Sequence, residues 1–139
     1  MAKDFYNQTV RLALEKEGWT ITHDPYYLKA LDSTTYAIDF GAERLIAAEK
    51  GNEKIAIEVK NFLTASIPHE FHQALGQYLN YQLFLNLKDK ERKLYLAVPI
   101  KAYETFFTKE STQLILDTFH IQLIIFNPEI NTIETWLEN

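Results

Sequence analysis

Apolar residues recur at helical spacing in three parts of the chain, and this period predicts its helices. The first helix has Asp4 as its expected N-cap and Gly18 as a C-terminal stop. The longest helix follows Pro68, and the stretch that begins at Pro99 is expected to break near Lys109. The predicted helices cover residues 4–18, 69–87, 99–109 and 111–118.

Two other hydrophobic patterns predict strands. Ile55, Ile57 and Val59 alternate with polar or small residues, a period of two that gives a strand two different faces. Residues 94–98 and 121–126 form nearly continuous apolar runs, which are typical of strands buried on both sides. The alternating strand spans 54–60, and further strands are expected at 19–22 and 43–49. The tail 132–137 fits either a strand or a helical turn. The order of these elements predicts an α/β fold, a mixed sheet with helices on both faces.

A Gly-Asn turn at residues 51–52 fixes how the strands on either side of it pair. Across such a turn Leu45 faces Glu58, and Glu43 faces Lys60. Residues that face each other lie on the same side of a sheet, so Glu43, Glu58 and Lys60 are predicted to share one patch.

Asp39 has the same parity as Glu43 and lies one step further along the strand, unless Gly41 introduces a bulge. Carboxylates clustered in this way can hold a hard divalent cation, Mg²⁺ or Mn²⁺, through oxygen. The predicted ligands are Glu58 with Asp39 or Glu43, and Lys60 would stabilise negative charge on a phosphate. The alternative is a hairpin face that carries solvated charge, with Glu43 and Lys60 as a cross-strand pair.

The helix predicted after Pro68 carries His69, Gln73, Gln77 and Tyr81 at every fourth position. Such a stripe, which contains neither lysine nor glutamate, either lines the carboxylate patch or faces solvent. Gln77 is the member expected to support the site. His69 and His72 lack a third ligand at a matching interval, and without cysteine a zinc site is not expected.

Composition and net charge indicate where the protein acts and how well it could bind nucleic acid. The 139 residues are 47% hydrophobic and contain no cysteine, which predicts a single domain, 1–139, in the cytoplasm and without a membrane span. The net charge of −5 is unfavourable for a domain that binds nucleic acid by itself. DNA binding would then need a metal, a local basic patch or a partner. Removal of the clustered carboxylates would relieve repulsion and leave stability unchanged or slightly higher.

An acidic residue, a hairpin, Glu58-x-Lys60 and a following helix resemble the PD-(D/E)xK nuclease superfamily, and Gln77-x-x-x-Tyr81 is similar to the helix motif of its RecB-like branch. The whole chain resembles more closely the XisH family, the fdxN element excision controlling factors of cyanobacteria. The segments that carry this resemblance are 38–43, 55–62, 71–81 and 94–99. No Pro-Asp dipeptide precedes the hairpin, so the superfamily's preference for aspartate favours Asp39, whereas the strand geometry favours Glu43.

The resemblance implies a restriction-endonuclease-like fold and a role in developmentally programmed DNA excision. A Mg²⁺-dependent endodeoxyribonuclease site would then contain Asp39, Glu43, Glu58, Lys60 and Gln77. The alternative is a non-catalytic regulatory subunit that keeps the fold and acts through a partner. The implied partners are a site-specific recombinase and a companion protein of the XisI type.

Aromatic residues of the second half predict association. Some of them exceed what one core needs and are expected to mark an interface for a second copy or a companion subunit. These residues are Phe106, Phe107, Phe119, Phe126 and Trp136. We therefore expect a homo-oligomer or a heteromeric complex, and weak DNA binding by the isolated protein.

Overall fold

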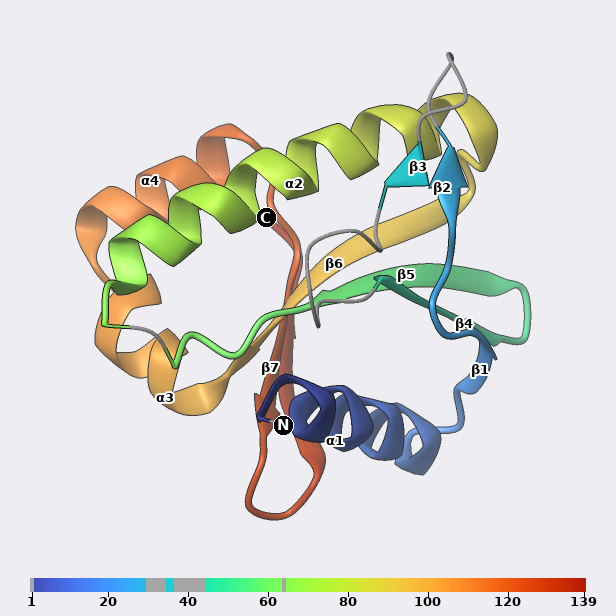
Figure 1. Ribbon diagram of the computed structural model, residues 1–139, viewed down its shortest axis with the longest axis horizontal. Coiled ribbons are helices and arrows are strands. Elements are labelled where there is room, and N and C mark those ends of the chain that lie inside the picture. Colours follow the sequence, from blue (N-terminus) through green and yellow to red (C-terminus); the bar gives the residue numbers. More distant parts are fainter. Residues whose placement is uncertain (1, 30–34, 37–44, 64) are drawn as a thin grey trace.

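A six-stranded mixed sheet crosses the middle of the molecule in the order β1-β4-β5-β6-β7-β8 (Figure 1). This computed structural model describes residues 2–29, 35–36, 45–63 and 65–139. The sheet consists of β1 (Thr20–His23), β4 (Leu45–Lys50), β5 (Glu53–Val59), β6 (Arg92–Pro99), β7 (Leu123–Asn127) and β8 (Thr132–Leu137). A separate pair is formed by β2 (Leu28–Lys29) and β3 (Thr35–Tyr36). The mixed α/β class expected from the sequence is confirmed.

Strand directions divide the sheet into two parts. β4 and β5 form an antiparallel hairpin, and β5, β6 and β7 run parallel to one another. β1 and β8 add antiparallel edges, so the tail that fitted either a strand or a helical turn is a strand. The near-continuous apolar runs in β6 and β7 are buried, as their hydrophobic pattern predicts.

Helices cover both faces of the sheet (Figure 1). The helical elements are α1 (Ala2–Lys16), α2 (Ile67–Lys88), α3 (Ile100–Ala102), a π-helical turn η1 (Tyr103–Phe107) and α4 (Glu110–Thr118). Helix α1 starts two residues before the expected N-cap, so the prediction for Asp4 was wrong. Gly18 has φ of +91°, a conformation that favours glycine, and it follows the end of α1 as expected.

The period-two pattern of β5 separates two hydrophobic cores. Ile55, Ile57 and Val59 pack with α1 on one face, whereas Ala56 belongs to the core beneath α2. Since side chains alternate along a strand, Glu58 also projects towards α2. The two faces of β5 therefore have different chemistry.

Helix α2 begins with a conventional cap. The Ser66 hydroxyl accepts a hydrogen bond from the backbone N–H of His69 at 3.3 Å, and Pro68 occupies the first turn, where no N–H is needed. The helix ends at Lys88, one residue beyond its predicted end. None of the helices in the described ranges is long and apolar enough to cross a bilayer.

The five aromatic residues singled out in the second half differ in burial. Phe107 and Phe126 are fully buried and are therefore not available to an interface, whereas Phe119 is 49% exposed. Phe107 stacks edge-on with Phe62 and Phe71, and Phe126 meets Tyr6 in the same way. These rings fill the space between the helices and the sheet. The core therefore uses more aromatic residues than the sequence pattern indicated.

Candidate functional site

The hairpin register is the one predicted from its turn. Leu45 faces Glu58 and Lys50 faces Glu53. Asp39 and Glu43, the two candidates for a further carboxylate ligand, lie outside the described residues. Of the predicted patch, Glu58 and Lys60 can therefore be described directly.

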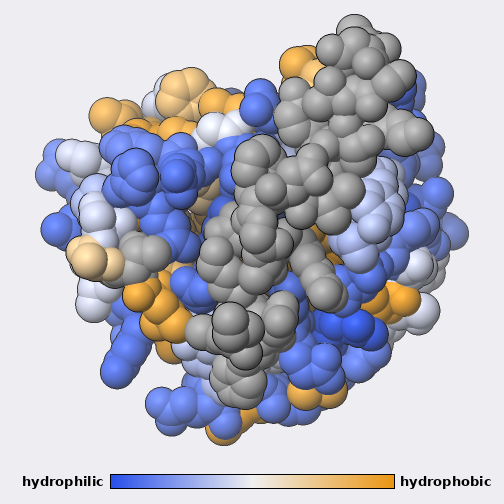
Figure 2. Space-filling model, viewed as in Figure 1, coloured by the Kyte–Doolittle hydropathy of each residue, from blue (hydrophilic) through white to orange (hydrophobic). Residues whose placement is uncertain are grey.

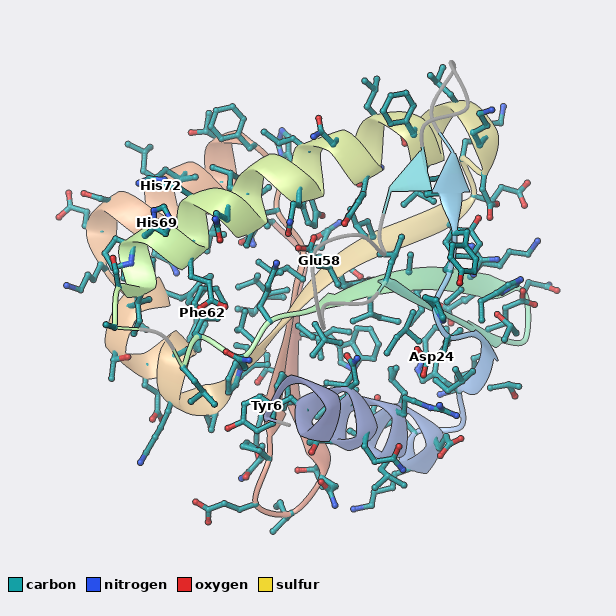
Figure 3. All side chains as sticks on the ribbon, viewed as in Figure 1. Tyr6, Asp24, Glu58, Phe62, His69 and His72 are labelled. Atoms are coloured by element: carbon teal, nitrogen blue, oxygen red, sulfur yellow. The ribbon has the colours of Figure 1, made fainter. Side chains whose placement is uncertain are left out.

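Glu58 and Lys60 are buried under α2, and Glu58 lies near the centre of the molecule (Figure 3). Their residues are 2% and 1% exposed. The Lys60 Nζ atom lies 3.3 Å from Glu58 Oε2. For this part of the hairpin the alternative of a solvated charged face is wrong, because α2 closes over it.

Gln77 joins the pair from the opposite element. The Lys60 ammonium donates a hydrogen bond of 2.6 Å to Gln77 Oε1. The Lys60 backbone N–H donates to Ala97 O at 3.0 Å, which anchors the end of the hairpin strand to β6. A carboxylate, an ammonium and a side-chain amide are thus held together by two strands and a helix. We refer to Glu58, Lys60 and Gln77 as the ionic cluster.

The stripe predicted on α2 faces inward only in part. Gln77 reaches the ionic cluster and Tyr81 is buried, whereas His69 and Gln73 are exposed. A helix turns by about 100° per residue, so every fourth residue drifts by about 40°. Over the whole stripe the drift amounts to roughly a third of a turn. His69 therefore lies on the outer side of the N-terminal part of α2 (Figure 3).

Tyr78 supports the cluster from the next position along α2, and the hydrophobic pattern could identify it only as a core residue. Its hydroxyl donates to Leu94 O and accepts from the Gln122 N–H, both at 3.0 Å. Burial raises the pKa of Tyr78 to about 12; the Gln122 N–H opposes this rise and the negative charge of Glu58 adds to it. The phenol is therefore a neutral link between α2, β6 and the start of β7.

Glu70 holds the segment that follows Lys60, a role without a signal in the sequence. Its carboxylate is buried, and Oε2 accepts the backbone N–H of Phe62 at 3.2 Å. Phe62 has φ of +54°, which is unusual for a residue with a side chain. Glu70 thus stabilises a strained turn directly after the hairpin strand.

A groove opens at the carboxyl ends of the parallel strands, the edge where ligands commonly bind in α/β sheets. Its volume is about 830 Å³. Asn61, Phe62 and Leu63 form one wall, directly after Lys60. Pro99 and Asn127, at the ends of the neighbouring strands, form another.

The described residues supply one carboxylate to the predicted metal site. Within those ranges, no three His, Asp or Glu side chains gather closely enough to hold a metal ion. Glu58 has the hard oxygen donors that Mg²⁺ and Mn²⁺ prefer, so its chemistry fits such an ion. The predicted site needs Asp39 or Glu43 as well.

The fold and the ionic cluster define a class: an α/β protein with a six-stranded mixed sheet and a buried Glu-x-Lys pair at the end of a hairpin. Within this class, the chain belongs to the XisH family. The model of that family, described as XisH protein, matches residues 1–134.

Two crystal structures have the same architecture. An XisH family protein from Nostoc punctiforme PCC 73102 is 40% identical, with a TM-score of 0.89, and the match covers 97% of this chain and 100% of that one. An fdxN element excision controlling factor protein from Anabaena variabilis is 37% identical, with a TM-score of 0.88, and 97% and 99% of the two chains are covered. No curated protein matches the chain.

Proposed function

We propose that the chain is a nuclease-like factor in the excision of a DNA element and carries a metal-dependent endonuclease site of the PD-(D/E)xK type. The proposed site consists of Glu58, Lys60 and Gln77 with Asp39 or Glu43. The observation that carries this proposal is the buried pair of Glu58 and Lys60, whose charged atoms lie 3.3 Å apart. The fold would then be restriction-endonuclease-like, with the hairpin β4-β5 leading into the parallel strands.

A buried ion pair needs a reason beyond stability. Withdrawing two charges from water costs several kcal/mol per ion, and apolar residues of similar volume often serve a scaffold as well or better. Glu58 and Lys60 are nevertheless both buried, at the end of a strand whose other buried residues are isoleucine, valine and alanine. Such clusters of buried charge are typical of functional sites.

The chemistry assigned to each residue follows from its donor atoms. Glu58, with Asp39 or Glu43, would hold Mg²⁺ or Mn²⁺. A bound ion of this kind activates a water molecule and shields the charge of a scissile phosphate. The Lys60 ammonium would donate to a phosphate oxygen as negative charge develops there. Gln77 keeps the ammonium in place through its 2.6 Å hydrogen bond.

The experiment that tests this proposal is a cleavage assay with supercoiled, nicked and branched DNA in the presence of Mg²⁺ or Mn²⁺. Glu58→Gln and Lys60→Met keep the approximate shape of each side chain and remove its charge. We expect both variants to lose at least about a hundredfold in rate, as removal of a transition-state contact of this kind does elsewhere. Gln77→Leu should lose less, because it acts through Lys60.

The matched control is Glu53→Gln, an exposed glutamate at the start of the same strand, which should cleave like the wild type. Thermal denaturation of each variant with and without the metal separates loss of folding from loss of chemistry. The proposal fails if the wild type neither binds divalent ions nor cleaves any of these DNA forms. It fails as well if Glu58→Gln cleaves at the rate of Glu53→Gln.

A second candidate is a regulatory subunit without catalysis, which acts on excision through another protein. The net charge of −5 favours it, because an acidic domain approaches DNA against repulsion. The Anabaena variabilis relative is itself named a controlling factor. The candidate partners are a companion protein of the XisI type and a site-specific recombinase. Excision that persists with Glu58→Gln and requires the partner would favour this function.

A further inference from the structure

The outer face of α2 has the composition of an interface. Residues 71–87 contain no Asp, Glu, Lys or Arg, although half of a surface helix normally carries charge for solubility. Leu79, Leu83 and Leu87 are 40%, 53% and 59% exposed, and they lie at successive turns of the helix. Figure 2 shows apolar residues along the upper edge of the molecule, where α2 and α4 lie. Depletion of charge combined with exposed leucine is typical of an interface core.

Gly76 lies in the same row as these leucines. It is exposed, and apart from its chain neighbours and the backbone of α2 a Cβ atom added there would meet no heavy atom of the described residues within 4 Å. Inside a helix, glycine is less favourable than alanine by about 1 kcal/mol. The described part of the chain offers no contact that requires this glycine. A second helix packed closely against α2 would require it.

We propose that α2 pairs antiparallel with α2 of a second copy of this chain, across a two-fold axis near Leu79 and Asn80. We call the row His72, Gly76, Leu79, Leu83 and Leu87 the α2 seam. In this arrangement Gly76 of each copy receives Leu83 of the other. His72 lies opposite Leu87.

A second copy fits the seam because the row is self-complementary. A two-fold interface brings the same surface of both chains together, so a small residue must face a large one on each side of the axis. Gly76 and Leu83 satisfy this condition when the axis lies midway between them, near Leu79 and Asn80. The antiparallel order also places the positive end of each helix dipole beside the negative end of the other.

The absence of charge along the α2 seam makes it a suitable contact between two acidic copies. Each copy carries −5, so two copies repel each other unless their contact keeps acidic groups apart. The seam is the part of α2 without any formal charge, and Glu70 and Lys88 mark its two ends. The residues that reach the core and the ionic cluster, Tyr78 and Gln77, lie on the other side of the helix. Dimerisation therefore leaves the ionic cluster of each copy intact.

A cross-linking experiment tests the register. The chain has no cysteine, so a single introduced thiol reports its own position. Asn80→Cys places one thiol of each copy near the axis, and we expect oxidation or a short bismaleimide to link most of the protein into covalent dimers. Glu134→Cys, on the exposed edge of β8, is the control and should form few covalent dimers under the same conditions.

Sedimentation equilibrium tests the association itself. Leu83→Glu should weaken dimerisation at least tenfold, because it brings two like charges into the seam. Gly76→Ala should also weaken it, since the added methyl groups keep the helices apart. Ile130 lies in the β7–β8 turn and is 56% exposed, so it matches Leu83 in size and exposure. Ile130→Glu should dimerise like the wild type. Circular dichroism confirms that each variant is folded.

Three outcomes would overturn the proposal. The first is a wild-type protein that is monomeric at every accessible concentration, in which case another protein covers the seam. The second is that the Leu83→Glu variant dimerises as strongly as the Ile130→Glu variant. The third is Glu134→Cys that cross-links as efficiently as Asn80→Cys.

Discussion

At the scale of single residues, the burial of Lys60 governs the response of the ionic cluster to mutation. Its ammonium lies in the core with Glu58 Oε2 at 3.3 Å. Loss of one partner from a buried ion pair leaves an uncompensated charge, which usually costs about 3–5 kcal/mol. The expectation that removing a carboxylate leaves stability unchanged holds for an exposed side chain, and Glu58 is buried.

We therefore predict that Glu58→Ala lowers the free energy of unfolding by about 3 kcal/mol or more. The double variant Glu58→Ala/Lys60→Met should recover part of this loss, because it also removes the buried positive charge that Glu58 balances in the wild type. Urea denaturation followed by circular dichroism measures both values. A Glu58→Ala variant as stable as the wild type would contradict this account of the pair.

At the scale of elements, Tyr78 joins α2 to two strands by accepting one hydrogen bond and donating another. Because burial raises its pKa to about 12 from the ordinary value of 10.0, the folded chain keeps this proton at a pH where the unfolded chain releases it. The corresponding stability is fully present below pH 10.0 and is lost as pH rises towards about 12.

Tyr78→Phe is predicted to lower the free energy of unfolding by about 1–3 kcal/mol at neutral pH, because the Leu94 carbonyl and the Gln122 N–H lose their partner. The variant should also lose less stability than the wild type between pH 10.0 and about 12. Denaturant titrations at neutral and alkaline pH measure both effects. Tyr27→Phe, an exposed tyrosine, is the control. Equal alkaline destabilisation of wild type and Tyr78→Phe would contradict this role.

At the scale of the whole molecule, the net charge of −5 opposes contact with DNA. Repulsion between exposed charges is screened beyond about 8 Å at physiological salt, so binding must come from short-range contacts, a metal or a partner. We predict weak DNA binding by the isolated protein, which strengthens when Mg²⁺ or Mn²⁺ is added. Fluorescence anisotropy over a range of salt concentrations measures it. Tight binding at physiological salt without metal or partner would contradict this prediction.

Local rules were sufficient for much of the fold. The turn at residues 51–52 determined that Leu45 faces Glu58, because hairpin register depends on a few neighbouring residues. The period of two in β5 separated the side that carries Glu58 from the side that packs on α1. The break before α4 and the apolar runs of β6 and β7 also followed from nearby residues.

The sequence by itself determined the hairpin, its register and the identity of Glu58, Lys60 and Gln77 as candidates, since these depend on spacing along the chain. Only the tertiary structure decided that the pair is buried, because burial depends on α2, which comes later in the chain and folds back over β5. The same packing sends His69 outwards and brings Glu70 to the backbone of Phe62. Contacts between distant segments have no period in the sequence, which is why the pattern alone could not supply them.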